Sequence, residues 1–222
     1  MPRRADVRDT YERIGPHFSA TREYAWPEVE TFVETNGVAG GLGLDLGCGN
    51  GRHAETLAPA VDRVVGVDLS RSLLSCARER AVERGFLDVL DLLQADAARL
   101  PLADNCVDLA VYVATLHHLP TRSGRLASLD ELARVLAPGG RALVSAWSTT
   151  HDRFEEYDDT AKTGFDDAIE WTLPDGETVD RFYHVYAPAE FERDLAESDL
   201  EVRSWELSSG NCYATVSGAV GE

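Results

Sequence analysis

Acidic residues at fixed distances behind a glycine-rich turn could allow this chain to hold a nucleoside. The run 42–51 reads Leu-Gly-Leu-Asp-Leu-Gly-Cys-Gly-Asn-Gly, so short apolar positions lead into three alternating glycines. This pattern predicts a buried strand that breaks into a tight turn, where the backbone can approach a nucleotide-like ligand. Asp68 lies 21 positions beyond Gly47, and an acid there can accept hydrogen bonds from both ribose hydroxyls. Asp96 and its neighbour Ala97 could meet the exocyclic amine of an adenine.

The spacing of the glycines argues against a dinucleotide. The turn carries Gly47, Gly49 and Gly51, and Arg52 stands where a dinucleotide-binding fingerprint needs a further glycine or an alanine. That position serves helix–strand packing and contact with the pyrophosphate. We therefore do not expect a dinucleotide.

The elements that must position these residues alternate between strand and helix. The sequence predicts strands at 42–46, 63–68, 87–94, 107–113 and 141–147, and helices at 52–58, 70–84 and 122–137. Such βαβ alternation predicts a mostly parallel sheet with helices on both faces. Ligands of such sheets bind outside the carboxyl ends of the strands, where the glycine turn and the acids would meet.

The two flanking regions have a different character. Residues 1–40 read as an N-terminal helical segment that is locally basic. Residues 148–186 are polar, acidic and aromatic, and a Pro-Asp-Gly turn at 174–176 predicts a hairpin. We expect this segment to be an insertion on the ligand side of a single domain, 1–222. A helix at 188–197 and strands near 199–207 and 211–217 complete the predicted elements.

Charge is the unusual feature of the composition. The 222 residues carry a formal charge of −18, and Lys162 is the only lysine. An acidic, lysine-poor surface stays hydrated in concentrated salt, so we expect a halophilic host. No apolar run is long enough to span a membrane and the N-terminus lacks a signal-peptide core, which predicts a soluble, cytoplasmic protein. The scattered cysteines predict free thiols and no metal site.

The glycine turn, the two acids and the Pro-Gly-Gly at 138–140 resemble the class I S-adenosylmethionine-dependent methyltransferases over residues 40–147. The resemblance implies an α/β, Rossmann-like fold with a mostly parallel seven-stranded sheet and S-adenosylmethionine as cofactor. Mapped by position, the family's cofactor contacts are Arg22, Asp45, Gly47, Gly49, Gly51, Asp68, Asp96, Ala97 and Leu116.

Further segments resemble the tRNA methyltransferases that esterify the carboxymethyl group of a wobble uridine. They are Tyr11-Glu12-Arg13-Ile14, His17-Phe18-Ser19-Ala20-Thr21-Arg22, Trp26-Pro27, His117-His118, Arg181-Phe182-Tyr183-His184-Val185-Tyr186 and Gly210-Asn211-Cys212-Tyr213-Ala214. The resemblance implies a carboxylate acceptor, which needs no strong general base because it is already ionised. Side chains that could act on the acceptor or on phosphate are Arg22, His117, Arg181 and His184.

The resemblance also implies a protein partner. Residues 86–93 predict an apolar strand at the sheet edge, which invites pairing with another chain. The resembled family works with a small zinc-binding activator that covers this edge by strand addition. Because a strongly acidic chain repels RNA, a small-molecule methyltransferase is the alternative. A non-catalytic cofactor-binding scaffold is a third interpretation.

Overall fold

The structure, a computed structural model, describes residues 3–38, 40–154 and 161–218. A seven-stranded sheet has the order β3-β2-β1-β4-β5-β9-β8, in which β9 alone runs antiparallel to its neighbours. Its strands are β1 (Leu42–Leu46), β2 (Arg63–Asp68), β3 (Leu90–Gln94), β4 (Val107–Tyr112), β5 (Leu136–Trp147), β8 (Leu200–Ser208) and β9 (Asn211–Gly218). The predicted Rossmann-like fold is confirmed.

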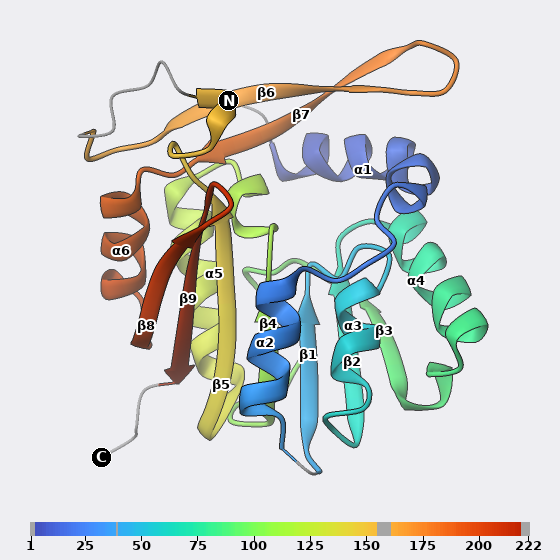
Figure 1. Cartoon of the computed structure of the whole chain (residues 1–222), viewed down its shortest axis with the longest axis vertical. Helices are drawn as coiled ribbons and strands as arrows, with labels where there is room; N and C mark the ends of the chain where they lie inside the picture. The colour runs from blue at the N-terminus through green and yellow to red at the C-terminus, as the bar shows by residue number, and fades with distance from the viewer. Residues whose placement is uncertain (1–2, 39, 155–160, 219–222) are drawn as a thin grey trace.

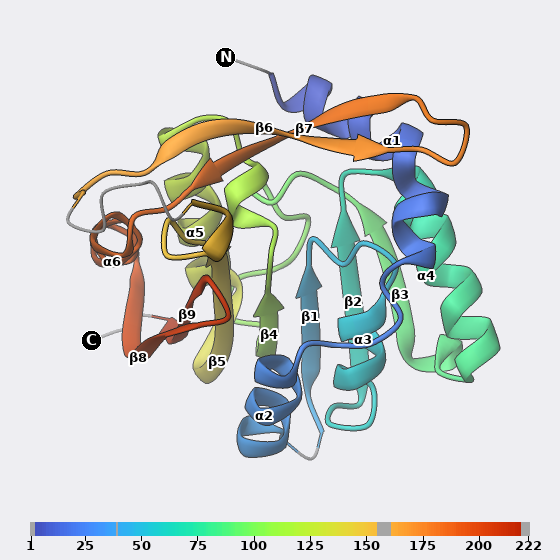
Figure 2. The same cartoon turned by 45° about the horizontal axis from the view of Figure 1, so that its top comes forward.

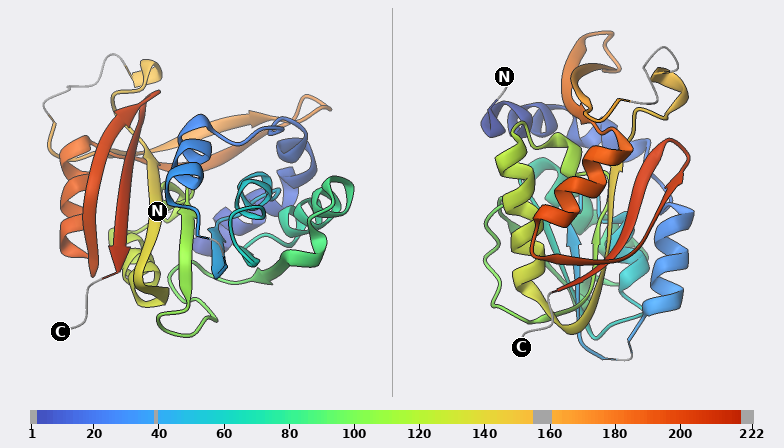
Figure 3. Two further views of the ribbon diagram at one scale, coloured as in Figure 1. Left: turned by 60° about the horizontal axis from the view of Figure 1, so that its bottom comes forward. Right: turned by 90° about the vertical axis from the view of Figure 1, so that its left-hand side faces the viewer.

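Helices cover both faces of this sheet (Figure 1). Side chains of α2 (Pro27–Asn36), α3 (Arg52–Leu57) and α4 (Arg71–Arg84) share one apolar core with the sheet. Side chains of α5 (Arg122–Val135) and α6 (Pro188–Glu197) share the other. Figure 3 shows α2 and α5 on opposite sides of the strands. The apolar strands β1 and β4 are buried on both faces, as parallel central strands require.

Capping residues set several helix ends as the sequence predicts. The Ser70 hydroxyl accepts the Leu73 amide at 3.3 Å at the start of α4, and Gly85 ends that helix with φ 77°. Thr121 caps α5 by accepting the Gly124 amide at 3.1 Å. Gly85 adopts its left-handed conformation at the end of α4 without steric cost, because glycine has no Cβ.

Two strand boundaries differ from expectation. Residues Leu87–Val89 form a short 3-10 turn, η1, so the edge strand begins at Leu90. Strand β5 begins at Leu136, where the sequence predicts the last turn of a helix, because Leu136 pairs with Val107 before the register shifts at the Pro-Gly-Gly. In the sequence, the Pro-Gly-Gly indicates the end of a helix, whereas in the structure it is an irregularity near the start of strand β5.

Two elements cross the carboxyl ends of the parallel strands (Figures 1 and 2). One is α1 (Arg4–Ala20), and the other is the hairpin of β6 (Phe165–Thr172) and β7 (Thr178–Val185). The predicted turn at 174–176 joins the hairpin strands, and residues 155–160 of the expected insertion lie outside the described residues. No helix in the described ranges is long and apolar enough to cross a membrane.

Candidate active site

A pocket opens at the carboxyl ends of β1, β2 and β4, beneath α1. Its floor comes from the glycine turn, and one face of α1 forms its roof with Arg4, Val7, Arg8 and Tyr11. These residues recur at helical spacing, so a single face of α1 closes over the pocket. Other lining residues are Phe18, Arg22, Gly47, Cys48, Gly49, Asn50, Arg52, His53, Asp68, Asp96, Ala97, Ala114, Thr115 and His118.

The glycines of the turn serve different purposes. A Cβ at Gly47 would lie 2.2 Å from the Thr115 hydroxyl oxygen, so this position is small because another strand end packs on it. A Cβ at Gly49 would meet nothing within 4 Å, and its φ is 52°. Gly49 therefore leaves open room beside bare backbone, as close approach of a ligand requires.

Two carboxylates stand at one end of the pocket. Asp68 accepts the Gly49 amide at 2.9 Å and the Ser70 amide at 2.8 Å, through different oxygens. Asp96 accepts the Ala98 amide at 2.9 Å and pairs with Arg4. Each carboxylate oxygen keeps a further lone pair. This end can therefore take hydrogen bonds from ribose hydroxyls and an exocyclic amine.

Asp45 supports the turn from below and does not line the pocket. It is 1% exposed and accepts the Ala54 amide at 2.8 Å, which joins the end of β1 to α3. Burial raises its pKa to about 7, against the opposing effect of that hydrogen bond.

The other end of the pocket is cationic. Arg22 lies 4.9 Å from the Phe18 ring centroid, and Arg52 lies 5.4 Å from the Trp26 ring centroid. Neither has a carboxylate partner among the described residues. The arginines of α1 and of its N-cap, by contrast, have carboxylate partners elsewhere in the chain: Arg3 with Asp6, Arg4 with Asp96, Arg8 with Asp9, and Arg13 with Glu177.

The ring nitrogens of His117 and His118 that lack a proton already accept hydrogen bonds within the protein. His118 Nδ1 faces the Phe182 carbonyl at 2.9 Å and must donate to it, so Nε2 accepts from the Tyr11 hydroxyl at 2.9 Å. The Trp147 amide donates to His117 Nδ1 at 2.9 Å, which leaves the proton of the neutral ring on Nε2. Burial lowers the pKa of His118 to about 4 and that of His117 well below its usual value.

Arg181 lies behind the pocket wall. It is 7% exposed and donates to the Tyr183 hydroxyl at 2.7 Å, while its Nε has no hydrogen-bond partner. Its guanidinium lies 4.8 Å from the Trp171 ring centroid. His117, stacked on Tyr183 at 4.9 Å, also lies behind this wall.

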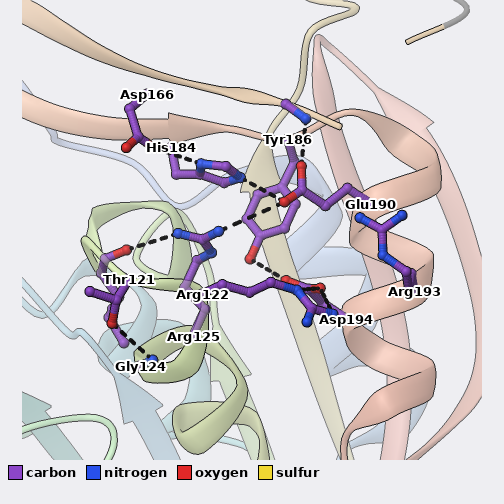
Figure 4. A network of polar contacts seen from close by, with 12 residues as sticks. Thr121, Arg122, Gly124, Arg125, Asp166, His184, Tyr186, Glu190, Arg193 and Asp194 are labelled. Atoms are coloured by element: carbon purple, nitrogen blue, oxygen red, sulfur yellow. Dashed lines mark hydrogen bonds and ion pairs between the residues drawn. The ribbon is translucent and has the colours of Figure 1, made fainter. Parts of the chain in front are cut away.

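His184 belongs to a separate polar network, shown in Figure 4. Its Nδ1 lies 2.8 Å from Asp166, and its Nε2 lies 3.1 Å from Glu190. Glu190 is also 3.8 Å from Arg125 and accepts the Gly164 amide. The network ties the hairpin to α5 and α6, so we assign His184 a structural role in place of the expected contact with the acceptor.

The predicted site residues therefore divide into two groups. Those that line the pocket are Arg22, Gly47, Gly49, Asp68, Asp96 and Ala97, and those that do not are Asp45, Gly51, Leu116, His117, Arg181 and His184. Leu116 is fully buried in the core, because Ala114, with φ 55°, turns the chain at the end of β4. Arg52 lines the pocket, which we did not predict from the sequence. Its position directly after Gly51 is the signal that could have indicated it.

A Methyltransferase domain family model matches residues 44–144, which contain the glycine turn, both pocket carboxylates and β4. Residues 44–144 therefore form a methyltransferase domain with the class I, S-adenosylmethionine-dependent fold. Its residues suit that cofactor: open backbone at Gly49, carboxylates for the adenosine, and arginines at the opposite end. This agrees with the predicted cofactor.

Relatives and solved structures are consistent with this assignment. The methyltransferase is 36% identical over 146 residues to a tRNA (carboxymethyluridine(34)-5-O)-methyltransferase of Arabidopsis thaliana, covering 66% of this chain and 33% of that protein. It is 32% identical over 174 residues to the enzyme of the same name from Saccharomyces cerevisiae, covering 76% of this chain and 57% of that protein. The chain thus spans a third to just over half of these relatives.

Two solved structures share the fold at low sequence identity. The DhpI-SAH complex is 20% identical with a TM-score of 0.73, over 97% of this chain and 96% of that one. The complex between the Haloferax volcanii Trm112 methyltransferase activator and a methyltransferase gives 16% identity and a TM-score of 0.73, over 97% of this chain and 99% of that one.

Proposed function

We propose that this methyltransferase esterifies the carboxymethyl group of a tRNA wobble uridine. One observation carries the proposal: among the described residues that line the pocket, Arg22 is a cation without a carboxylate partner, and neither lining histidine is placed to act as a base. Burial holds the pKa of His53 well below its usual value. His118 and Tyr11 bond to each other, and burial holds the pKa of Tyr11 well above its usual value. Methylation of a hydroxyl or an ammonium would require a base, whereas a carboxylate is already ionised. The choice of carboxymethyluridine in tRNA as the acceptor rests on the names of the two relatives.

The chain's own residues then act by position and charge. Bound S-adenosylmethionine supplies an electrophilic methyl group on its sulfonium. Arg22 can orient an acceptor carboxylate by a charge-assisted hydrogen bond. Its guanidinium lies 4.9 Å from the Phe18 ring centroid and 5.7 Å from the Trp171 ring centroid, and these two rings contact each other, which restricts its orientation. The roof formed by α1 covers one side of the pocket, and restricted access of water would strengthen these interactions and favour in-line approach.

A partner subunit is part of the proposal. Strand β3 is outermost in the sheet, and its Leu92 and Leu93 are partly exposed. A strand from a small zinc-binding activator could extend the sheet at this edge. The solved complex with the Haloferax volcanii activator supports such an assembly. Hydrogen exchange should show added protection of residues 90–94 when the partner is co-purified at molar salt.

The strong negative charge favours a second candidate, a small-molecule carboxylate acceptor. Phosphate contacts need arginine or lysine, and the arginines of α1 are already paired within the chain. Mass spectrometry of tRNA nucleosides from cells with and without the gene separates the two candidates. Loss of the methyl ester, with accumulation of the free carboxymethyl nucleoside, is expected. An unchanged nucleoside profile would contradict the tRNA substrate and favour a small carboxylic acid as the methyl acceptor.

A further inference from the structure

The link between α1 and α2 presents a tyrosine to solvent beside the pocket. Tyr24 is 78% exposed, and its side chain makes no hydrogen bond, ion pair or ring contact with the described residues. We propose that the Tyr24 ring is a stacking platform for a base of single-stranded RNA, next to the nucleotide that enters the pocket. The choice of RNA as the ligand rests on the proposed function.

The backbone that carries Tyr24 is fixed by side chains from three other parts of the chain. The carbonyls of residues 22–24 accept hydrogen bonds, in order, from the side chains of Asn50, Arg80 and Arg52. These three donors belong to the glycine turn, to α4 and to α3, beside which the link passes (Figures 1 and 2). A ring on fixed backbone has little freedom left to lose when a ligand packs against it. The exposed tyrosine is therefore preorganised for a flat, apolar ligand.

Tyr24 lies within one or two nucleotides of the pocket. Arg22 stands two residues before it and lines the pocket, and Arg52, which lines the pocket too, donates to the Tyr24 carbonyl at 3.4 Å. Two residues of chain span at most about 7 Å. Successive nucleotides of one strand lie about 3.4 Å apart when stacked and farther apart when the strand is extended. A neighbour of the nucleotide in the pocket can therefore reach the tyrosine ring.

Stacking is the RNA contact that suits a strongly acidic chain. The formal charge of −18 opposes the approach of phosphates, and salt weakens phosphate contacts further. A base stacked on an aromatic ring gains affinity without a counter-charge, and every base has a flat face to offer. Such a contact releases no counterions, so it persists in concentrated salt. An exposed aromatic ring therefore supplies affinity that this surface cannot obtain from charge.

Only two tyrosine, tryptophan or phenylalanine side chains are exposed among the described residues. Trp205, at 39% exposure, lies on β8, whereas Tyr24 is twice as exposed. Strand β8 is outermost in the sheet, and Figure 1 shows it at the opposite margin from α3 and α4. The position beside the pocket thus selects Tyr24, and Trp205 provides a matched control.

Fluorescence anisotropy with an anticodon stem–loop RNA tests the proposal on the full chain in the presence of S-adenosylhomocysteine. Tyr24→Ala should weaken RNA binding by about 5- to 150-fold, the range for the loss of one stacked base. Tyr24→Phe keeps the ring and should bind RNA within about twofold of the parent. The weakening in Tyr24→Ala should be the same at low and at molar salt, because stacking releases no counterions. Trp205→Ala should bind RNA as the parent does.

A fluorescent base locates the contact. Stacking quenches 2-aminopurine, which is placed on either side of the wobble uridine in turn. At saturation, one of the two positions should be dimmer in the complex with the parent than in the complex with Tyr24→Ala. The affinity for S-adenosylhomocysteine should be unchanged in Tyr24→Ala, because only an exposed side chain is removed.

The outcomes separate this proposal from the proposed function. Equal RNA affinity in the parent and in Tyr24→Ala would overturn the stacking role alone. An equal loss of affinity for RNA and for S-adenosylhomocysteine would also overturn it, since the tyrosine would then only support the fold. Loss of a co-purified protein from Tyr24→Ala at unchanged RNA affinity would assign the ring to a protein contact instead. A parent chain that binds no RNA would contradict the proposed function itself.

Discussion

The side-chain amide of Asn50 donates a hydrogen bond of 2.8 Å to the backbone carbonyl of Arg22. The same amide donates to the Ser19 carbonyl at 3.3 Å, and Asn50 is 4% exposed. One residue of the glycine turn therefore fixes the end of α1, where the cation assigned to the acceptor begins. The glycine turn and Arg22, which we propose orients the acceptor, are joined by this contact.

Asn50→Ala should lower kcat/KM about tenfold, because two carbonyls lose a buried donor and Arg22 loses its anchor. Asn50→Asp should be at least as damaging, since a carboxylate cannot donate. Asn36→Ala is the matched control, because the Asn36 amide donates only to the Phe32 carbonyl within α2. Steady-state kinetics with tRNA measure kcat/KM for these variants. An equal loss of kcat/KM in Asn50→Ala and Asn36→Ala would contradict a link between Asn50 and Arg22.

The Arg4–Asp96 ion pair joins the roof helix to the acidic end of the pocket. Arg4→Gln should speed release of S-adenosylhomocysteine by about two- to fivefold, the modest effect of a part-exposed pair. Stopped-flow fluorescence measures the rate. Arg3→Gln removes a pair with Asp6 at the N-cap of the same helix, and neither Arg3 nor Asp6 lines the pocket. Release that is equally fast in both variants would mean that the helix, and not this pair, controls exit.

Two of the three glutamates of α6, Glu190 and Glu197, should differ sharply in their contribution to stability. Burial raises the pKa of Glu190, but hydrogen bonds from His184 and Gly164 outweigh it and hold the pKa below its usual value. Glu190→Gln should cost about 2–4 kcal/mol of unfolding free energy, because Arg125 and His184 lose a buried partner. Glu197→Gln, at a surface pair with Arg122, should cost less than about 1 kcal/mol.

Urea unfolding at neutral pH measures both variants. His184→Gln tests the role of the histidine in the same network. It should lower stability while the folded fraction keeps its turnover, whereas lost turnover at full stability would restore the predicted acceptor role of His184.

Asp45 should make the protein less stable as pH rises from about 4 to about 7. Its folded-state pKa of about 7 lies above the unfolded value. The neutral acid is therefore favoured in the fold, and ionisation costs stability until pH passes the folded pKa. Asp45→Asn should remove this dependence of stability on pH. Compared with the parent, the free energy of unfolding of the variant should be higher at pH 8 than at pH 4, by on the order of a few kcal/mol.

Urea midpoints of the ligand-free protein at several pH values measure this slope. Asp62→Asn, at an exposed position, is the control and should follow the parent. Parallel curves for the parent and Asp45→Asn would show that the buried acid does not titrate in this range.

The methyl-transfer rate should be flat between about pH 6 and pH 9. An acceptor carboxylate is ionised throughout, and burial keeps the pKa values of His117 and His118 below this range. Single-turnover rates with saturating tRNA measure it. A tenfold rise per pH unit would reveal a required deprotonation and contradict a carboxylate acceptor.

The sequence by itself determined the parallel sheet, the glycine turn and the position of two acids at strand ends. These features are local: a strand must break at glycines to admit a ligand, and acids must follow strand ends. Gly47, Gly49, Asp68, Asp96 and Ala97 all line the pocket as their spacing predicts. Cap residues such as Ser70 and Gly85 set helix ends for the same reason.

Which arginines and histidines are paired within the chain, and which line the pocket, was decided only by the tertiary structure. Whether an arginine faces a ligand or a carboxylate depends on partners far away in the chain, as Arg4 with Asp96 and Arg13 with Glu177 show. His117 and His118 are neighbours in sequence, yet only His118 lines the pocket, because the 3-10 turn η2 (Leu116–His118) points their rings differently. Spacing along one strand fixes local geometry, whereas charge pairing and burial follow from packing between strands, helices and the hairpin.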